Sequence, residues 1–212
     1  MNITLIGTGN VGTGLASAFA AAGCDVALGG RSADTARDVA RTVADRHGTP
    51  VHGGDIAAAL SRSDLVVLAV PYGAVDELAA THDFAGKTVV DATNPLTDDF
   101  SALTIGHDTS GAERIQARLP DASVVKGFNT VFAQIYARGL RFGDRAVPVF
   151  LATDDESARR RVAETARHAG FEPVDAGPLS NARHLEPLAA LNIQLGYALG
   201  RGTQIVPAWL ER

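Results

Sequence analysis

Cysteine is nearly absent from this sequence of 212 residues, in which Cys24 is the only one. A single cysteine excludes an internal disulfide and any metal site built from several cysteines. Cys24 lies between Gly23 and the apolar run Val26–Leu28, which indicates a small buried side chain. The histidines form no H-x-H or H-x-x-x-H pair, and His184 and Glu186 are two positions apart, so they do not share a helix face. We therefore expect no metal site.

Basic charge and long hydrophobic runs are also scarce. The chain has 19 Lys and Arg against 24 Asp and Glu, a net charge of -5 and a pI of about 5.6, which argues against nucleic-acid and anionic-membrane partners. The longest apolar run, Leu65–Val70, is far shorter than the roughly 20 residues of a membrane span. Met1 leads directly into the apolar run Ile3–Ile6 without a basic targeting region. We expect a soluble, cytoplasmic protein.

Short apolar, β-branched runs alternate with segments of helical period along the chain. The predicted strands are Ile3–Ile6, Asp25–Leu28, Leu65–Val70, Thr88–Asp91, Ser123–Val125, Val147–Ala152 and Glu172–Asp175. The predicted helices are Gly12–Ala22, Ala33–His47, Ile56–Ser61, Ala74–Ala80, Ala112–Leu119 and Ser157–Ala169. Strands that are almost continuously apolar are buried on both faces, so the alternation predicts an α/β fold with a doubly wound, mainly parallel sheet.

A glycine-rich segment, Gly7-Thr8-Gly9-Asn10-Val11-Gly12, directly follows the first predicted strand and directly precedes a helix. Gly7 allows a sharp turn, Gly9 allows a pyrophosphate to approach the backbone, and Gly12 allows the helix to pack close to the strand. The free N–H groups at the start of the helix then face the phosphates. This context predicts a Rossmann-type, dinucleotide-binding fold, with an ordinary glycine-rich turn as the alternative.

An acidic residue is missing where the second predicted strand ends, and the first one after that strand is Asp34. Domains that bind NAD carry an acid there for the ribose 2′-hydroxyl, and such an acid would repel a 2′-phosphate. Arg31 instead offers paired charge-assisted hydrogen bonds to a phosphate. Ser32 offers another hydrogen bond to the phosphate or caps the next helix. Thr8 is expected to contribute to the phosphate site from the neighbouring glycine-rich turn, and Arg37 from the helix that follows Arg31. We therefore expect NADP(H) as the cofactor.

Three further strand ends carry residues suited to ligand contact, because ligands of open α/β sheets bind beyond the carboxyl ends of the strands. These ends read Ala69-Val70-Pro71, Asn94-Pro95 and Asn129-Thr130-Val131. The prolines set rigid exits from two of the strands. The Asn and Thr side chains are suited to a carboxamide or an acceptor ring, or they stabilise their own turns.

Lys126, close before these residues, has three interpretations. It is catalytic, it binds phosphate, or it pairs with Asp91 or Asp175. The sequence leaves the choice open.

The last predicted element is one long apolar helix over Asn181–Gly200. Its broad apolar face comprises Leu185, Leu188, Ala189, Leu191, Asn192 and Leu195. We expect residues 1–152 to form the dinucleotide-binding domain and residues 153–212 to form a C-terminal βα extension of the same compact unit. The helix then packs on the sheet or on a second subunit in a homodimer.

Taken together, the motifs of this chain resemble those of the NADPH-dependent coenzyme F420 reductase family. The segments that carry the resemblance are Ile6–Gly12, Gly30–Ser32, Val70-Pro71, Asp91–Leu96, Ser110–Glu113, Lys126–Thr130 and Asp175–Leu179. The segment Lys126–Thr130 is also similar to the NADPH-binding domain of the six-transmembrane metalloreductases, which pass the hydride to a flavin. The resemblance implies a Rossmann domain with a small C-terminal helical part, a dimer, and direct hydride transfer between NADPH and a deazaflavin or flavin.

These observations predict an oxidoreductase that transfers hydride between NADPH and a deazaflavin (coenzyme F420) or flavin acceptor. The expected cofactor-binding residues are Gly7, Thr8, Gly9, Asn10, Val11, Gly12, Gly30, Arg31, Ser32, Ala69, Val70, Pro71, Asn94, Pro95 and Val131. Asn129 and Thr130 are expected to contact the substrate, and we expect no catalytic side chain, because the cofactor carries the chemistry. The alternatives are a reductase of a small imine or carbonyl compound and a non-catalytic NADP(H) sensor.

Overall fold

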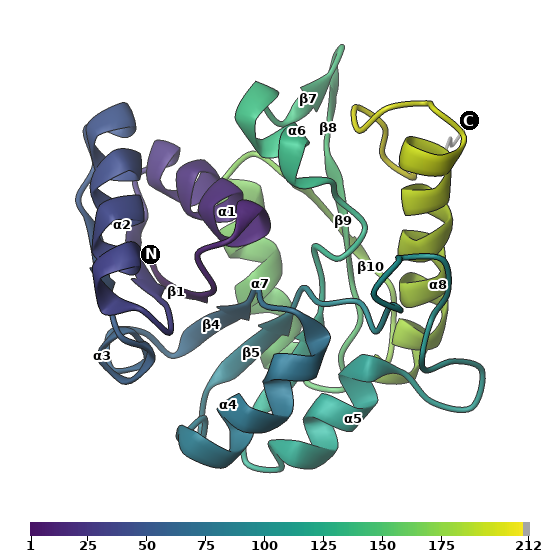
Figure 1. Cartoon of the computed structure of the whole chain (residues 1–212), viewed down its shortest axis with the longest axis horizontal. Helices are drawn as coiled ribbons and strands as arrows, with labels where there is room; N and C mark the ends of the chain where they lie inside the picture. Colours follow the sequence, from purple (N-terminus) through teal and green to yellow (C-terminus); the bar gives the residue numbers. More distant parts are fainter. Residues whose placement is uncertain (210–212) are drawn as a thin grey trace.

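The centre of the molecule is a six-stranded parallel sheet with strand order β3-β2-β1-β4-β5-β6, flanked by helices on both faces (Figure 1). The computed structural model describes residues 1–209. The strands of the sheet are β1 Asn2–Ile6, β2 Asp25–Gly29, β3 Val51–Gly54, β4 Leu65–Leu68, β5 Thr88–Asp91 and β6 Ser123–Lys126. This order confirms the predicted doubly wound, Rossmann-type fold, and the order reverses between β1 and β4.

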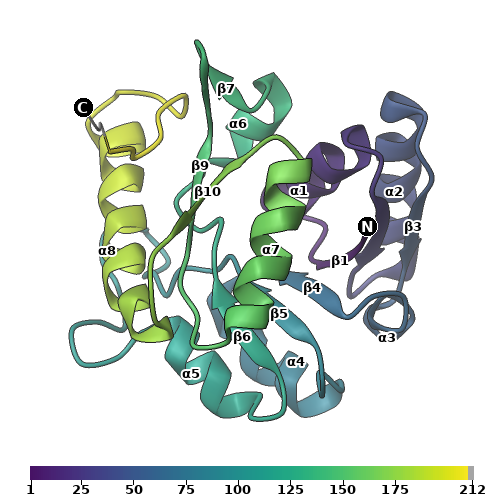
Figure 2. The ribbon, with the colours of Figure 1, turned by 180° about the vertical axis from the view of Figure 1, so that it is seen from behind.

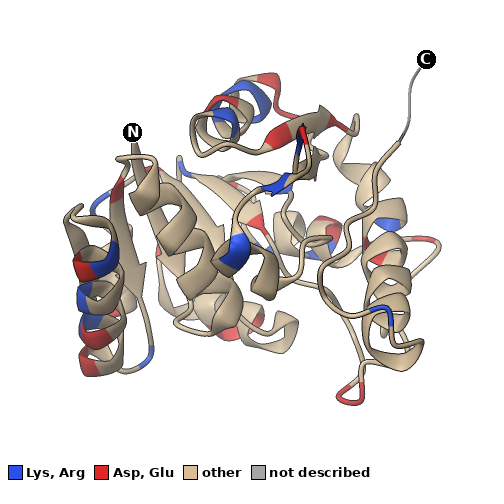
Figure 3. Cartoon of the chain, turned by 90° about the horizontal axis from the view of Figure 1, so that it is seen from above, with Lys and Arg blue, Asp and Glu red and all other residues tan. Residues whose placement is uncertain are grey.

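Two hydrophobic cores, one on each face of the sheet, lie between the sheet and the helices that cover it. The helices are α1 Asn10–Ala21, α2 Ala33–His47, α3 Ile56–Leu60, α4 Val75–Thr81, α5 Gly111–Arg118, α6 Ala133–Arg138, α7 Glu156–His168 and α8 Ala182–Ile193. On one face lie α1, α2 and α7 (Figure 2), and Phe19, Val43 and Val162 of these helices share a core. On the other face, α3, α4 and α5 form a second core that includes Leu78 and Ile115. The outer side of α2 carries interleaved acidic and basic side chains (Figure 3).

Sequence patterns missed the edge strand β3 and the short helix α6. The β3 sequence Val-His-Gly-Gly has no apolar run, because an edge strand pairs on one side only and is half-exposed here. Gly53 is required there, since a Cβ at this position would lie 2.4 Å from the carbonyl oxygen of Ala36 in α2. A short hairpin of β7 (Arg141–Phe142) and β8 (Arg145–Ala146) also had no clear pattern.

Several predicted boundaries shift by one or two residues. Strand β4 ends at Leu68 rather than at Val70, and helix α1 begins at Asn10 rather than at Gly12. Backbone pairing nevertheless continues past β4, because the N–H of Ala69 donates to the carbonyl oxygen of Ile6 at 2.8 Å.

The C-terminal part forms a separate parallel pair of strands, β9 (Pro148–Leu151) and β10 (Glu172–Asp175), on which α8 packs through Leu185. Two backbone hydrogen bonds between Lys126 and Ala152, of 2.8 and 3.0 Å, join β9 to β6 in the antiparallel sense. The 3₁₀ turn η2 (Leu179–Asn181) precedes α8, and the π-helix η3 (Gln194–Ala198) continues it, close to the predicted helix over 181–200. The domain division at residue 152 stays a prediction. Within residues 1–209, no helix has both the length and the apolar character needed to cross a membrane.

A buried ion network fastens α8 to the sheet. Lys126, at the end of β6, has no exposed side-chain surface, and its Nζ lies 2.9 Å from Asp91 Oδ2 and 3.0 Å from Glu186 Oε1. Lys126 also donates a hydrogen bond to the carbonyl oxygen of Thr93 at 2.7 Å. Burial alone would lower the pKa of Lys126, but the two negative charges outweigh that effect and raise the pKa above its usual value.

Glu186 of α8 also binds the start of α5. Its carboxylate accepts hydrogen bonds from the backbone N–H groups of Gly111 at 2.9 Å and Ala112 at 3.1 Å. Of the roles that the sequence left open for Lys126, the structure shows pairing with Asp91. The alternative partner, Asp175, binds Arg159 instead at 3.0 Å.

We expect Lys126→Met to lower the free energy of unfolding by about 3–5 kcal/mol, because it leaves two buried carboxylates without a counter-charge. Urea denaturation followed by circular dichroism measures the change. The matched control is Arg160→Met, which removes an exposed pair with Glu156 and should cost no more than about 0.5 kcal/mol. Equal losses in the two variants would show that the buried network does not hold the fold together.

Candidate functional site

The glycine-rich turn after β1 has the tight geometry that its sequence predicts. Gly7 has a φ of +122°, and a Cβ there would lie 2.2 Å from the carbonyl oxygen of Ala69. A Cβ on Gly12 would lie 2.0 Å from the carbonyl oxygen of Gly7. Gly9 differs, since a Cβ at this position would meet no atom within 4 Å. The first and third glycines are therefore needed for packing, while the second keeps a space open.

The start of α1 faces this open space with its backbone polar groups. Gly9 is the N-cap residue, no side chain of residues 1–209 caps the helix, and its first turn carries no acidic residue. The first N–H groups of a helix have no partner within the helix, and the positive end of the helix dipole favours an anion beside them. The hydroxyl of Thr13 holds the turn by donating to the carbonyl oxygen of Thr8 at 3.2 Å.

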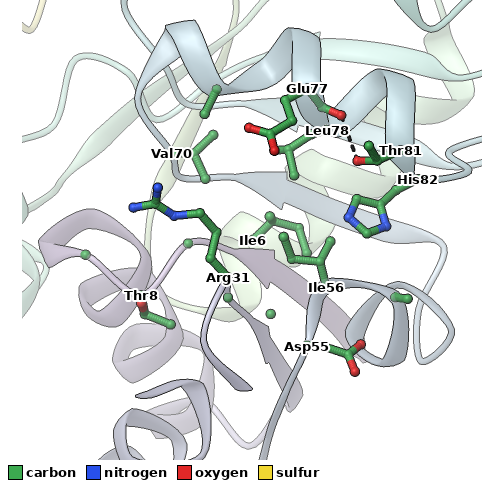
Figure 4. A pocket seen from close by; sticks show the side chains of 16 residues that line it. Ile6, Thr8, Arg31, Asp55, Ile56, Val70, Glu77, Leu78, Thr81 and His82 are labelled. Atoms are coloured by element: carbon green, nitrogen blue, oxygen red, sulfur yellow. Dashed lines mark hydrogen bonds between the residues drawn. The ribbon is translucent and has the colours of Figure 1, made fainter. Parts of the chain in front are cut away.

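A cavity of about 500 Å³ lies on one side of the turn, beyond the carboxyl ends of β1, β2 and β4 (Figure 4). Thr8 and Arg31 lie toward one end of this first cavity, while Asp55 and His82 lie toward the other (Figure 4). Its remaining lining residues are Ile6, Gly7, Gly9, Gly29, Gly30, Ile56, Ala57, Val70, Ala74, Glu77, Leu78 and Thr81.

Arg31 carries the positive charge of the first cavity. Within residues 1–209 it forms no ion pair, whereas the nearby Arg37 pairs with Asp34 and lies outside this cavity. Ser32 caps α2, because its Oγ accepts a hydrogen bond from the N–H of Thr35 at 3.2 Å. The carboxylate of Asp55 likewise caps α3, by accepting from the N–H of Ala58 at 2.7 Å.

A second cavity of about 480 Å³ lies beyond α1's first turn, where Asn10 and Val11 line it. Strand ends and α8 supply most of its other lining residues, which are Ala92, Asn94, Phe100, Phe128, Asn129, Thr130, Val131, Phe132, Ala133, Gln134, Ala189, Asn192, Ile193 and Tyr197. No charged side chain is among them. Phe100 and Tyr197 lie at its exposed side, with 58% and 61% of their surface accessible.

Two asparagines join the ends of β5 and β6 at the second cavity. Asn94 Nδ2 donates to the backbone carbonyl of Asn129 at 3.0 Å, and Asn129 Nδ2 donates in return to Asn94 Oδ1 at 3.0 Å. Asn129 Nδ2 also donates to the carbonyl oxygen of Leu185 at 3.0 Å, which ties the pair to α8. Asn192 of α8 similarly donates to the carbonyl oxygen of Thr130 at 3.1 Å.

Phe128, which precedes Asn129, has a left-handed backbone conformation. Its φ is +65°, a conformation that costs a non-glycine residue on the order of 1 kcal/mol or more. The ring of Phe128 is buried edge-on against Phe171, with ring centroids 5.3 Å apart. This packing holds the strained turn in place and leaves Asn129 at the cavity.

The structure distributes the residues that the sequence singled out over both cavities. Gly7, Thr8, Gly9, Gly30, Arg31 and Val70 line the first, and Asn10, Val11, Asn94, Asn129, Thr130 and Val131 line the second. The others support the walls without lining them. Gly12 and Ala69 pack against Gly7, Ser32 caps α2, Pro71 precedes the 3₁₀ turn η1 (Tyr72–Ala74), and Pro95 lies near Gly111.

Sequence reasoning missed several residues that line the cavities. Asp55 and Ile56 directly follow β3, so recognition of that edge strand would have placed them at the ligand-binding end of the sheet. His82 at the end of α4, together with Phe100 and Tyr197, has no local pattern that marks it as a site residue.

The strand order and the glycine turn define a Rossmann-type protein, and comparison with known proteins identifies its family. The chain belongs to the family of coenzyme F420-dependent NADP oxidoreductases, whose family model matches residues 2–95. It is 31% identical over 212 residues to the F420-dependent NADP reductase of Methanothermobacter marburgensis, with 92% of each chain covered.

Two further proteins are similar to this chain. A crystal structure from Arthrobacter sp. FB24, assigned as an F420-dependent NADP-reductase, has a TM-score of 0.80 and 31% identity, and the match covers 96% of both chains. The metalloreductase STEAP2 of Homo sapiens is 28% identical over 191 residues. That match covers 89% of this chain, which spans 36% of the metalloreductase's length.

The glycine turn can be tested by stability alone. We expect Gly12→Ala to lower the free energy of unfolding by more than about 2 kcal/mol, because its Cβ overlaps the Gly7 carbonyl. Gly9→Ala is the matched control and should change it by no more than about 1 kcal/mol, since that Cβ points into open space. Urea denaturation measures both, and a Gly12→Ala protein as stable as Gly9→Ala would contradict the assigned packing.

Proposed function

We propose that this chain is an NADP(H)-dependent oxidoreductase that transfers hydride between NADPH and a deazaflavin, coenzyme F420, or a flavin. The observation that carries the proposal is the position of the glycine turn between two unlike cavities. The first offers Arg31 as a positive charge, and the second is uncharged and bordered by aromatic rings. The name of the family and that of the relative from Methanothermobacter marburgensis support NADP(H) and coenzyme F420.

The residues of the turn fit a dinucleotide. The space over Gly9 and the uncapped N–H groups of α1 are suited to a pyrophosphate. Gly7, Thr8, Asn10, Val11 and Gly12 complete this cradle. On this assignment the adenosine half occupies the first cavity, and the nicotinamide half enters the second.

Arg31 is assigned to the 2′-phosphate of NADP(H). Gly30 leaves room for the phosphate, and the charge-assisted hydrogen bonds of a guanidinium suit it. Ser32 keeps its capping role, and its hydroxyl adds a possible phosphate donor. Val70 lines the same cavity, and Ala69 and Pro71 shape the exit from β4 beside it.

The second cavity is assigned to the nicotinamide and the acceptor. Asn94, Pro95 and Val131 shape the side that follows the strand ends, and we assign Asn129 and Thr130 to ligand contact there. NADPH supplies the hydride, so these residues bind, orient and shield the reacting rings.

The lining of the second cavity favours a planar ring over a small imine or carbonyl compound. Reduction of such compounds commonly uses a positioned general acid. Among the described lining residues, Tyr197 has the only titratable side chain. Phe100 and Tyr197 offer aromatic surface for a flat acceptor. The carbonyl oxygen of Phe100 accepts a hydrogen bond from Gln194 Nε2 at 2.9 Å, which holds this part of the wall.

The homodimer and the cytoplasmic location stay predictions. The expected apolar face of α8 is divided in the structure. Leu185, Ala189 and Asn192 are buried within the chain, whereas Leu191 is 56% exposed. Leu191 and Leu199 therefore remain for contact with a second copy.

Turnover with a panel of acceptors tests the proposed reaction. With NADPH present, coenzyme F420, FMN, FAD or riboflavin should cause loss of the NADPH absorbance. We expect Tyr197→Ala to raise the KM for the ring acceptor about 2- to 10-fold, since it removes an aromatic contact, with NADPH binding unchanged. Tyr197→Phe, which keeps the ring, is the control.

Two results would contradict this reaction. Oxidation of NADPH only by small imines or carbonyl compounds would identify a reductase of that kind. Tight NADPH binding without turnover of any acceptor would instead identify a sensor.

Cofactor choice is tested at Arg31. We expect Arg31→Ala to weaken NADPH binding about 10- to 100-fold, because a charge-assisted contact is lost, with NADH binding nearly unchanged. Fluorescence titration of the reduced nicotinamide gives both dissociation constants. Arg37→Ala, which breaks the ion pair with Asp34 outside the cavity, is the matched control. Equal affinity of the wild type for NADPH and NADH would refute the assignment to NADP(H).

A further inference from the structure

One buried hydrogen-bond acceptor at the second cavity has no partner among the residues that the structure describes. Asn129 is 8% exposed, and no donor among residues 1–209 reaches its Oδ1. Leaving a buried polar atom unpaired is costly, so such atoms in native proteins usually have a partner. Asn129 lines the cavity, so a bound ligand can supply the missing donor.

The orientation of the Asn129 amide is fixed by its neighbours. Both hydrogens of its Nδ2 are committed, one to Asn94 Oδ1 and one to the carbonyl oxygen of Leu185, each at 3.0 Å. A flipped amide would set its oxygen against the oxygen of Leu185. Asn94 is oriented in turn by its bond to the Asn129 backbone carbonyl. The free group of Asn129 is therefore an acceptor, and its partner must carry an N–H or O–H.

The position of Asn129 in the cavity indicates which of the two proposed ligands it contacts, the nicotinamide or the acceptor ring. Asn10 and Val11 of the phosphate-binding turn line this same cavity, so the ring that follows the pyrophosphate is the first to enter it. Asn129 is nearly buried, whereas Phe100 and Tyr197 form the exposed side. The nicotinamide then lies at the inner side, with the acceptor ring outside it.

We propose that Asn129 orients the nicotinamide: its Oδ1 accepts a hydrogen bond from the carboxamide N–H₂ and so fixes which face of the ring meets the acceptor. This inference rests on the proposed function and sharpens it. Asn129, which the sequence assigned to the substrate, becomes a cofactor-orienting residue. Its two outgoing hydrogen bonds make it rigid, because they hold it between β5 and α8.

The 3-acetylpyridine analogue of NADP⁺ tests this role, because an acetyl group replaces the carboxamide and carries no N–H. We expect the wild-type chain to bind NADP⁺ about 10- to 100-fold more tightly than the analogue, since the analogue leaves Oδ1 unpaired. In Asn129→Leu, which has no acceptor, the ratio of the two dissociation constants should fall to about 1. Isothermal titration calorimetry measures both constants.

A further variant separates orientation from a general loss of structure. Asn94→Leu removes the hydrogen bond between the asparagines but leaves Asn129 Oδ1 and the bond from Asn129 Nδ2 to Leu185, so it should keep the preference for NADP⁺. A second measurement uses NADPH deuterated on one face of C4. The wild type should transfer label from a single face, and Asn129→Leu should transfer it from both.

The outcomes distinguish this inference from the proposed function. Failure of the wild type to bind NADP⁺ would overturn both. Binding of NADP⁺ with equal affinity for the analogue, or an unchanged preference in a folded Asn129→Leu, would overturn the role of Asn129 alone. If Asn129→Leu does not fold, the wild-type comparison of NADP⁺ with the analogue still decides, because equal affinities would overturn the role of Asn129.

Discussion

The buried ammonium of Lys126 is the interaction on which the rest of the structure depends. It lies between Asp91 at the end of β5 and Glu186 in α8, and Glu186 also receives the first N–H groups of α5. One positive charge therefore joins elements that are far apart in the sequence. Helix α8 also carries Asn192 and other lining residues of the second cavity. The wall of that cavity is thus positioned by a charge that does not itself line it.

The glycine turn divides the charged part of the site from the uncharged part. On one side, Arg31 faces a cavity that also includes Asp55, Glu77 and His82. On the other side, the lining side chains are amides, hydroxyls and apolar groups. Such a division suits a ligand with phosphate groups at one end and a neutral, reactive ring at the other. It leaves little for the protein to do in the second cavity except orient rings and exclude water.

The fold could be predicted well wherever burial leaves a mark on local sequence. Strands such as Leu65–Leu68 are apolar at every position because both faces are covered, and this pattern is easy to recognise. The strand Val51–Gly54 was not predicted, because it pairs with one neighbour only and has no continuous apolar run. It also needs glycine at position 53, where a side chain would clash with α2. The site followed the same rule: residues next to recognised strands were found, while His82, Phe100 and Tyr197 were not.

By itself, the sequence determined the parallel sheet, the glycine turn, and the basic residue after β2 in place of an acid. These features depend on residues within a few positions of each other, so short-range patterns report them. Only the tertiary structure decided that Lys126 has two carboxylate partners, that Arg37 turns away to Asp34, and that Asn129 keeps a free oxygen. Each of these depends on contacts across 35 or more positions or on side-chain direction. Spacing in the sequence carries no record of either.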